Sequence, residues 1–411
     1  MLKIFKTFMK SIKMILKFFK KVPSSAFYFN LPHQKKIVIF DDETSKDLNS
    51  ILLDQDYFLL KIRYSNVNEF FIHPLIFLKI ILNFRGNIWT AYLISVIQII
   101  SPKIVITFTD NNLKFFEIAK IMKNKINFFA IQNGARYDFN RYKHQYKMRI
   151  YKKDLSKDFF IPNLFCFGEY EVDDYKKKNI SVSKFYPVGS LRLANFLNEK
   201  KNKTLNEILY QKYEYDIYLI SDGIIVEFDK RFGIEGAADE MGKYINFVVK
   251  YCRKNNKKFL LSLKRLNSNH KNLELELDFY KKYLGKEDYD YLISNSTLNF
   301  SKSKYLSYEL MLKSELTIAT FSTMLRENLS LGRKSLSINF MKNSLFDFPI
   351  DGICKINDCS FEELESKIDK ILKMSTNEYL EKLNMKNRYL MSFDKSHSTI
   401  DKIKKTINQY L

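Results

Sequence analysis

Small hydroxyl residues follow a short apolar run in the segment TIATFSTMLRENLSLGRK, which covers residues 317–334. The apolar run predicts a strand over 316–319, and Ser322 and Thr323 predict the start of a helix over 323–331. The free backbone N–H groups and the positive dipole end of such a helix suit a phosphate. Glu327 lies one turn into the helix, where a carboxylate can accept hydrogen bonds from ribose hydroxyls. An ordinary helix cap with a solvated Glu327 is the alternative to this nucleotide site.

Two carboxylates and two cations follow other apolar runs in the second half of the chain. Asp222 and Asp229 lie in IYLISDGIIVEFDKRFG, directly after a predicted strand over 217–220. Lys264 and Arg265 end a predicted strand over 258–263, where cations would neutralise a phosphate or a sugar carboxylate. Loops that only solvate these charges are the alternative for each pair.

Polar residues also end the apolar runs of the first half, in TFTDNN, IQNGAR, FGEYEVDDY and PVGSLRL. The Asn133–Gly134 pair is typical of a sharp turn with accessible amides, and a plain β-turn is the alternative. Because ligands bind at the carboxyl ends of parallel strands, we expect these side chains to share one cleft. The candidates are Glu169 as a carboxylate, and Asp110, Asn111, Gln132, Asn133, Gly134, Arg136 and Ser190.

Several other chemistries lack their motifs. The sequence contains no GxxxxGK[ST], no GxGxxG after a strand and no HExxH, and its five histidines are far apart. Asp173 and Asp174 lie inside a predicted helix rather than at a strand end, so a divalent metal for diphosphate binding is not indicated. The four cysteines lack the spacing of a zinc site and are expected to be reduced thiols. We therefore expect neither a metal nor another cofactor.

The elements that must position these residues form two successive series of alternating strands and helices along the 411 residues. Expected elements include strands over 36–40, 103–108 and 127–131, a strand over 291–293, and a core helix within 70–82. Repeated strand and helix predict two doubly wound α/β lobes, Rossmann-like, over residues 33–200 and 214–355. Residues 360–411 are expected to be helical and to pack back across the lobes.

The first 22 residues combine an apolar stripe with seven lysines at helical spacing. Such a basic amphipathic helix lies in the plane of an anionic membrane, and we expect residues 1–21 to bind one. No run of about 18 apolar residues qualifies as a spanning helix. A secretory signal fits less well because lysines interrupt its apolar core, and a helix that packs on its own protein is a further alternative.

A formal net charge of +22 attracts any polyanion. A nucleic-acid-binding protein is therefore one alternative function. However, the lysines are scattered instead of clustering with aromatic residues on one element, and no nucleic-acid motif is visible, so no nucleic-acid partner is expected.

The order of the motifs TFTDNN, IQNGAR, FGEYEVDDY, PVGSLRL, ISDG, SLKR and TFSTMLRENLSLGRK resembles the surface carbohydrate biosynthesis proteins of bacterial O-antigen and capsule loci. This family is similar to the retaining β-Kdo transferases. The resemblance implies a GT-B-like fold, a CMP-activated ulosonic acid donor, no metal, and double displacement through an aspartate. On this basis Asp229 is the expected nucleophile, Asp222 its substitute and Glu169 a second carboxylate. Arg265 stands where a cleft histidine would be expected beside Lys264, which leaves other nucleotide sugars open.

The predicted function is thus a glycosyltransferase that transfers Kdo or a related sugar to a glycan or lipid-linked acceptor of O-antigen, capsule or lipooligosaccharide. The expected location is the cytoplasm, peripheral on the inner face of the membrane. A polyol-phosphate transferase of the CDP-glycerol type is the enzymatic alternative. Such enzymes share the GT-B fold but depend on a pair of histidines in the cleft. The five histidines of this sequence fit that role poorly.

Overall fold

The computed structural model describes residues 25–42, 45–62, 67–135, 160–200, 202–209, 211–222, 236–264, 270–301, 303–384 and 386–411. The expected membrane helix over residues 1–22 lies outside them, as do the site candidates Arg136, Asp229 and Arg265. Within the described residues, no helix has both the length and the apolar character that crossing a membrane requires.

The first lobe is built on a six-stranded, all-parallel sheet. Its central strands, such as IVIF and IVIT, are rich in β-branched residues and wholly buried, because helices or the tail cover both faces of the sheet. Helices α4 (Ile88–Ile100), α5 (Leu113–Met122) and α8 (Glu169–Lys177) belong to the crossovers between strands. The strand order is β3 (Tyr57–Leu60), β2 (Ile37–Phe40), β5 (Ile104–Thr107), β6 (Asn127–Ile131), β7 (Phe160–Cys166) and β8 (Ser181–Pro187).

A smaller unit lies at one end of this lobe. Strands β1 (Ser25–Tyr28) and β4 (Asn68–Phe71) form a two-stranded parallel sheet, and α3 (Pro74–Asn83) follows β4 directly. The core helix expected within 70–82 therefore begins only at Pro74, because residues 68–71 pair with β1 as a strand. The short helices η1 (Ser45–Leu48) and α2 (Asn49–Leu52) follow β2.

The second lobe repeats the design with a five-stranded parallel sheet. The strand order is β10 (Phe259–Ser262), β9 (Tyr215–Ile220), β11 (Ser314–Ala319), β12 (Lys334–Asn339) and β13 (Lys355–Asn357). Its α-helices are α10 (Leu205–Leu209), α12 (Ala237–Lys254), α13 (His270–Tyr283), α14 (Lys286–Ser294), α15 (Leu306–Leu312) and α16 (Thr323–Ser330), and its short helices are η3 (Thr297–Asn299) and η4 (Ser344–Phe346).

The strand predicted over 291–293 is wrong, because these residues lie inside α14. A short apolar run does not by itself distinguish strand from helix. Here Tyr289, Leu292 and Ile293 share one helix face, and they pack against the second-lobe core. Glu287 and Asp288 in the first turn favour the helix through its dipole.

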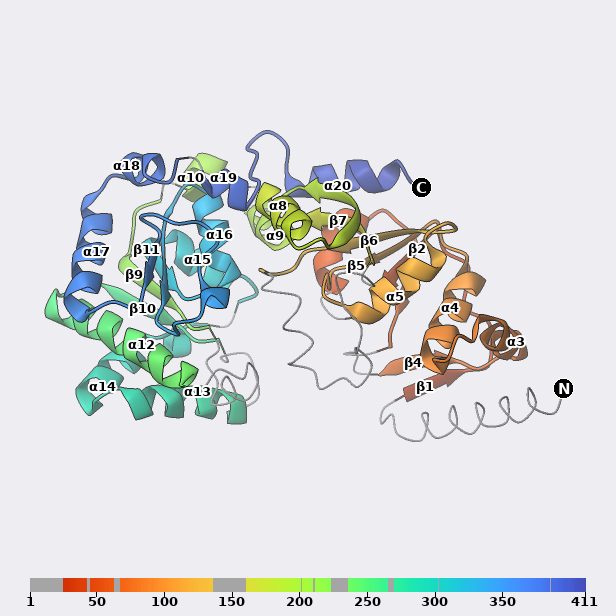
Figure 1. The fold of residues 1–411 in the computed structure, drawn as a ribbon, viewed down its shortest axis with the longest axis horizontal. Helices are drawn as coiled ribbons and strands as arrows, with labels where there is room; N and C mark the ends of the chain where they lie inside the picture. Colours follow the sequence, from red (N-terminus) through yellow and green to blue (C-terminus); the bar gives the residue numbers. More distant parts are fainter. Residues whose placement is uncertain are drawn as a thin grey trace.

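Helix α9 (Leu191–Glu199) and the C-terminal helices join the lobes (Figure 1). In α9, Leu191 and Ala194 pack into the first-lobe core, whereas Leu193 and Phe196 pack into the second. Helices α17 (Phe361–Lys373), α18 (Thr376–Glu381) and α19 (Lys386–Leu390) lie on the second lobe, and α20 (Thr399–Asn408) lies on the first. The tail thus crosses the lobes as predicted, although residues 391–398 are not helical.

Two glycines allow this tail to approach the ends of β7 and β8 closely. A Cβ at Gly168 would lie 2.5 Å from the Tyr389 carbonyl oxygen, and one at Gly189 would overlap the Ser392 carbonyl oxygen. The Ser392 amide donates a hydrogen bond of 2.7 Å to the Phe167 carbonyl. These two glycines therefore serve the packing of the tail.

We predict that Gly189→Ala destabilises the protein by about 2 kcal/mol more than Gly86→Ala, as measured by urea unfolding. Both residues have a positive φ, +94° and +93°, so both substitutions cost about 1 kcal/mol of backbone strain. Only Gly189 has a backbone atom in the way, because nothing lies within 4 Å of a Cβ at Gly86. Equal losses for the two variants would contradict the proposed close packing of the tail.

Candidate active site between the lobes

A pocket of about 490 Å³ lies between the two lobes. The second lobe contributes the ends of β9, β10 and β11 and the start of α16, and the first contributes the turn after β6 and helix α9. Among its lining residues are seven of the sequence candidates, namely Asn133, Gly134, Asp222, Lys264, Ser322, Thr323 and Glu327.

The start of α16 forms one wall of this pocket. Ser322 is the N-cap in extended conformation, with φ −62° and ψ 136°, and its Oγ accepts a long hydrogen bond of 3.4 Å from the Met324 amide. Thr323 Oγ1 accepts a 2.9 Å hydrogen bond from the Ala135 amide of the first lobe. The amide-rich end of the helix therefore lines the interlobe pocket, where its positive dipole end would attract an anion.

Asp222 ends β9 in the same pocket and is half-buried. The Thr320 amide donates a 2.7 Å hydrogen bond to Asp222 Oδ2. Burial raises the pKa of Asp222 to about 6, although this hydrogen bond and the charge of Lys264 oppose the rise. The Lys264 side chain is exposed. One carboxylate and one cation thus flank the start of α16.

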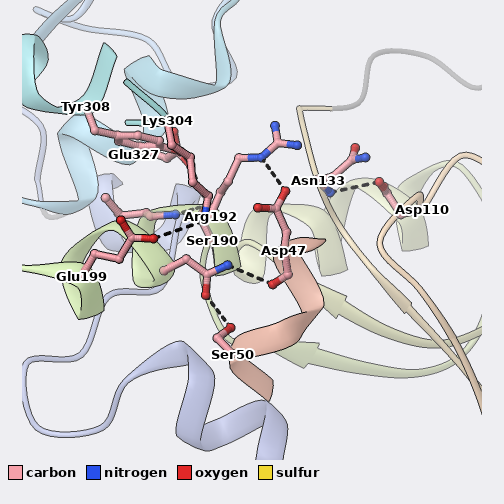
Figure 2. Close-up of polar contacts among 12 residues, drawn as sticks. Asp47, Ser50, Asp110, Asn133, Ser190, Arg192, Glu199, Lys304, Tyr308 and Glu327 are labelled. Carbon is pink, nitrogen blue, oxygen red and sulfur yellow. Dashed lines mark hydrogen bonds and ion pairs between the residues drawn. The ribbon is translucent and has the colours of Figure 1, made fainter. Parts of the chain in front are cut away.

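Glu327 and Ser190, two separate ligand candidates in the sequence, bind each other (Figure 2). Glu327 is only 2% exposed, and its Oε1 accepts hydrogen bonds from Ser190 Oγ at 2.5 Å and from the Tyr308 hydroxyl at 2.9 Å. Burial raises the pKa of Glu327. Glu327 was expected to accept hydrogen bonds from ribose, but its Oε1 accepts them from two protein hydroxyls. The hydrogen bond between Ser190 and Glu327 joins the two lobes.

The model of a family described as "putative O-antigen biosynthesis protein" matches residues 129–409, more than half of the chain. The chain belongs to this O-antigen biosynthesis family. This confirms the coarser part of the resemblance seen in the sequence, whereas no comparison identifies a Kdo-specific family. Among curated proteins, none matches the chain.

Solved structures resemble this O-antigen family protein in fold. A histidine-to-asparagine variant of the wall teichoic acid polymerase TagF is 12% identical, with a TM-score of 0.50 and coverage of 100% of this chain and 98% of that chain. The UDP-GlcNAc 2-epimerase of Methanocaldococcus jannaschii in complex with UDP-GlcNAc and UDP is 14% identical, with a TM-score of 0.48 and coverage of 91% and 99%. The two facing parallel sheets form the predicted GT-B-like fold.

A second buried link between the lobes was not anticipated from the sequence. Arg326 Nη1 lies 2.6 Å from Glu171 Oε1, and both side chains are 3% exposed. Gln132 Nε2 also donates to Glu171 Oε1, at 3.3 Å, and the Arg326 guanidinium lies over the Tyr170 ring. Gln132, a cleft candidate in the sequence, is therefore buried in this network and does not line the pocket.

Three other candidates are not brought to the pocket. Asp110 is buried, and its Oδ1 accepts a 3.1 Å hydrogen bond from the Asn133 amide, so it shapes the turn that does line the pocket (Figure 2). Asn111 is exposed next to it. Glu169, expected as a second carboxylate, is exposed at the start of α8, whereas Glu171 of the same helix is the buried carboxylate at the lobe interface.

Two cations of the pocket were missed in the sequence. Arg192 stands in the PVGSLRL motif on α9, where its Nε lies 3.2 Å from Asp47 Oδ2 and its guanidinium lies over the Phe108 ring. Figure 2 shows its terminal nitrogens directed away from Asp47. Lys304, in the loop before α15, lies 3.2 Å from Glu199. The motif could have indicated Arg192 because it follows Ser190 at a strand end, but no pattern marked Lys304.

The described residues contain no group of three histidine, cysteine, aspartate or glutamate side chains that could hold a metal ion. The four cysteines are unpaired thiols, as expected, and three of them are buried.

Removing one partner of the buried ion pair should be costly. We predict that Arg326→Met lowers the free energy of unfolding by about 3–5 kcal/mol, because it leaves Glu171 buried without a counter-charge. The double variant Glu171→Gln/Arg326→Met has no charge at this buried pair and should recover more than half of this loss. Chemical unfolding measures both, and a double variant as unstable as the single one would contradict the role assigned to the charge pair.

The raised pKa of Asp222 predicts a pH-dependent stability. The folded state holds the proton up to about pH 6, whereas the unfolded chain releases it near pH 4. Raising the pH from 4 to 6 therefore destabilises the wild type relative to Asp222→Asn by about 2 kcal/mol, and the difference levels off above about pH 7. Urea midpoints of both proteins at pH 4.5 and 7 measure this. A difference that does not change with pH would contradict it.

Proposed function

We propose that this protein transfers a sugar from a nucleotide-activated donor to a glycan or lipid-linked acceptor during surface polysaccharide synthesis. The observation that carries the proposal is the start of α16, which lies beside Lys264 and Asp222 in the interlobe pocket. Helix amides and a nearby cation suit a donor phosphate, and a carboxylate beside them suits glycosyl chemistry. Membership of the O-antigen biosynthesis family supports the same assignment.

The finer proposal is a CMP-activated ulosonic acid, Kdo or a related sugar, as donor. Its single phosphate would bind at Ser322, Thr323 and Lys264 without a metal, since the helix dipole and the lysine supply the positive charge. A sugar carboxylate would bind the terminal nitrogens of Arg192, because guanidinium groups match carboxylates in geometry. Three cations and two carboxylates, Asp222 and Glu327, line the pocket, and this excess of cations favours an anionic donor.

Asp222 is the proposed nucleophile among the described residues. With a pKa of about 6 it is mostly ionised at pH 7, as a nucleophile must be. Its carboxylate would attack the anomeric carbon, and the bond to the phosphate would break with its electron pair leaving on the nucleotide. The acceptor hydroxyl would then attack the same carbon, break its bond to Asp222 and release its proton to solvent. The two successive inversions retain the configuration.

The enzymatic alternative, a polyol-phosphate transferase, would need a cleft histidine pair. No histidine is among the described residues that line the pocket. We favour sugar transfer, in the cytoplasm on the inner face of the membrane, because a carboxylate, Asp222, lies beside the helix start in the pocket.

We predict that Ser322→Ala/Thr323→Ala weakens binding of the preferred nucleotide about tenfold or more, because the hydroxyls order the amides that face the phosphate. Calorimetry with CMP, CDP, UDP and GDP measures the affinity. Ser360→Ala is the matched control, since Ser360 caps α17, whose residues do not line the pocket, by the same kind of hydrogen bond. Equal affinities of the wild type and the double variant would contradict the proposed phosphate site.

A further inference from the structure

Large apolar side chains gather at one end of the first lobe. Twelve large apolar side chains are exposed among the described residues, and nine of them lie on or beside β1, β4 and α3. Strand β1 pairs with β4, and α3 follows β4 directly, so these elements form one end of the lobe (Figure 1). We call this set the apolar face; it consists of Phe27, Tyr28, Phe29, Val67, Leu75, Leu78, Ile81, Leu82 and Phe84.

Helix α3 is apolar on two opposite sides. Ile76 and Ile80 are buried in the first-lobe core, as expected of a surface helix. Leu78 and Leu82 lie on the opposite side, spaced by four residues, and are 54% and 75% exposed. A surface helix of a soluble domain normally presents polar residues there, so the exposed side of α3 fits an apolar environment outside the protein.

The charge around the apolar face indicates which environment that is. Strand β1 and helix α3 contain no aspartate or glutamate, and the one carboxylate of β4, Glu69, lies 2.8 Å from Lys61. Lys79 lies in α3, and Arg85 follows it. The chain from residue 1 to residue 40, which includes β1, also has no acidic residue and contains nine lysines. A protein partner does not require that every carboxylate there be absent or paired with a lysine, but an anionic lipid surface repels unpaired carboxylates.

We propose that the apolar face docks on an anionic bilayer, with α3 in the plane of the interface. The apolar side chains of α3 and of residues 27–29 insert among the acyl chains near the headgroups, and the surrounding lysines and arginines bind lipid phosphates. Helix α3 and β4 pack into the first-lobe core, so the face would fix how the enzyme is oriented on the membrane. A basic leading segment alone would only tether it.

Vesicle flotation of the full-length protein tests this proposal. The probe is vesicles of phosphatidylglycerol and phosphatidylcholine, with pure phosphatidylcholine as the neutral comparison. Leu78→Glu/Leu82→Glu should lower the partition coefficient on anionic vesicles about tenfold or more, since each change removes an inserting side chain. The matched control is Leu53→Glu/Leu275→Glu, which places the same two charges at leucines that are 77% and 45% exposed outside the apolar face.

Equal vesicle binding by the two double variants would overturn the proposal. It would also be overturned if light scattering showed a wild-type dimer that becomes a monomer in Leu78→Glu/Leu82→Glu while vesicle binding is unchanged, because the face would then bind a second copy. The nucleotide-induced rise in melting temperature should be the same in the wild type and both variants. A failure of the nucleotide site and a failure of membrane docking are therefore distinguishable.

A second measurement does not depend on adding charges. The chain has a single tryptophan, Trp89. In a Trp89→Phe background, Leu82→Trp should show a blue-shifted emission on anionic vesicles and quenching by brominated lipid, whereas Leu53→Trp should show neither. Identical spectra with and without vesicles for Leu82→Trp would overturn the proposal.

Discussion

The arrangement of the two lobes depends on the buried polar contacts of α16. This helix begins at the pocket, and one turn later its neighbouring residues Arg326 and Glu327 reach Glu171 and Ser190 of the first lobe. Moving one lobe against the other would leave these charges buried and without partners, which costs far more than the contacts themselves contribute. The same contacts therefore fix the position of the helix start, including Ser322, relative to the first-lobe wall of the pocket.

Much of the fold could be predicted from the sequence because its strands are short, wholly apolar runs that end in polar residues. The buried strands IVIF and IVIT are present where expected, and the polar residues that follow β9, β10 and β11 meet in one pocket. The 291–293 segment was predicted wrongly, since three apolar residues fit either a strand or one face of a helix. A hydrophobic pattern that repeats over many residues therefore identifies an element more reliably than a run of three apolar residues does.

The site could be predicted only in part, because sequence position does not reveal which polar groups bind each other. Ser190 and Glu327 stand 137 residues apart, and each is typical of a ligand contact until the structure pairs them. Gln132 is similar, since it stabilises Glu171 and the end of β7 instead of facing the pocket. The glycines Gly168 and Gly189 make room for the tail, a packing partner some 200 residues later in the chain that no local pattern indicates.

The start of α16 is proposed to bind the phosphate of a nucleotide-activated sugar between the lobes. A crystal structure of the full-length protein soaked with the nucleotide that binds best tests it most directly. We expect a phosphate within hydrogen-bond distance of the Met324 amide and of Lys264 Nζ, with the nucleoside inside the interlobe pocket. A nucleotide bound elsewhere, with the start of α16 vacant at saturating concentration, would contradict it.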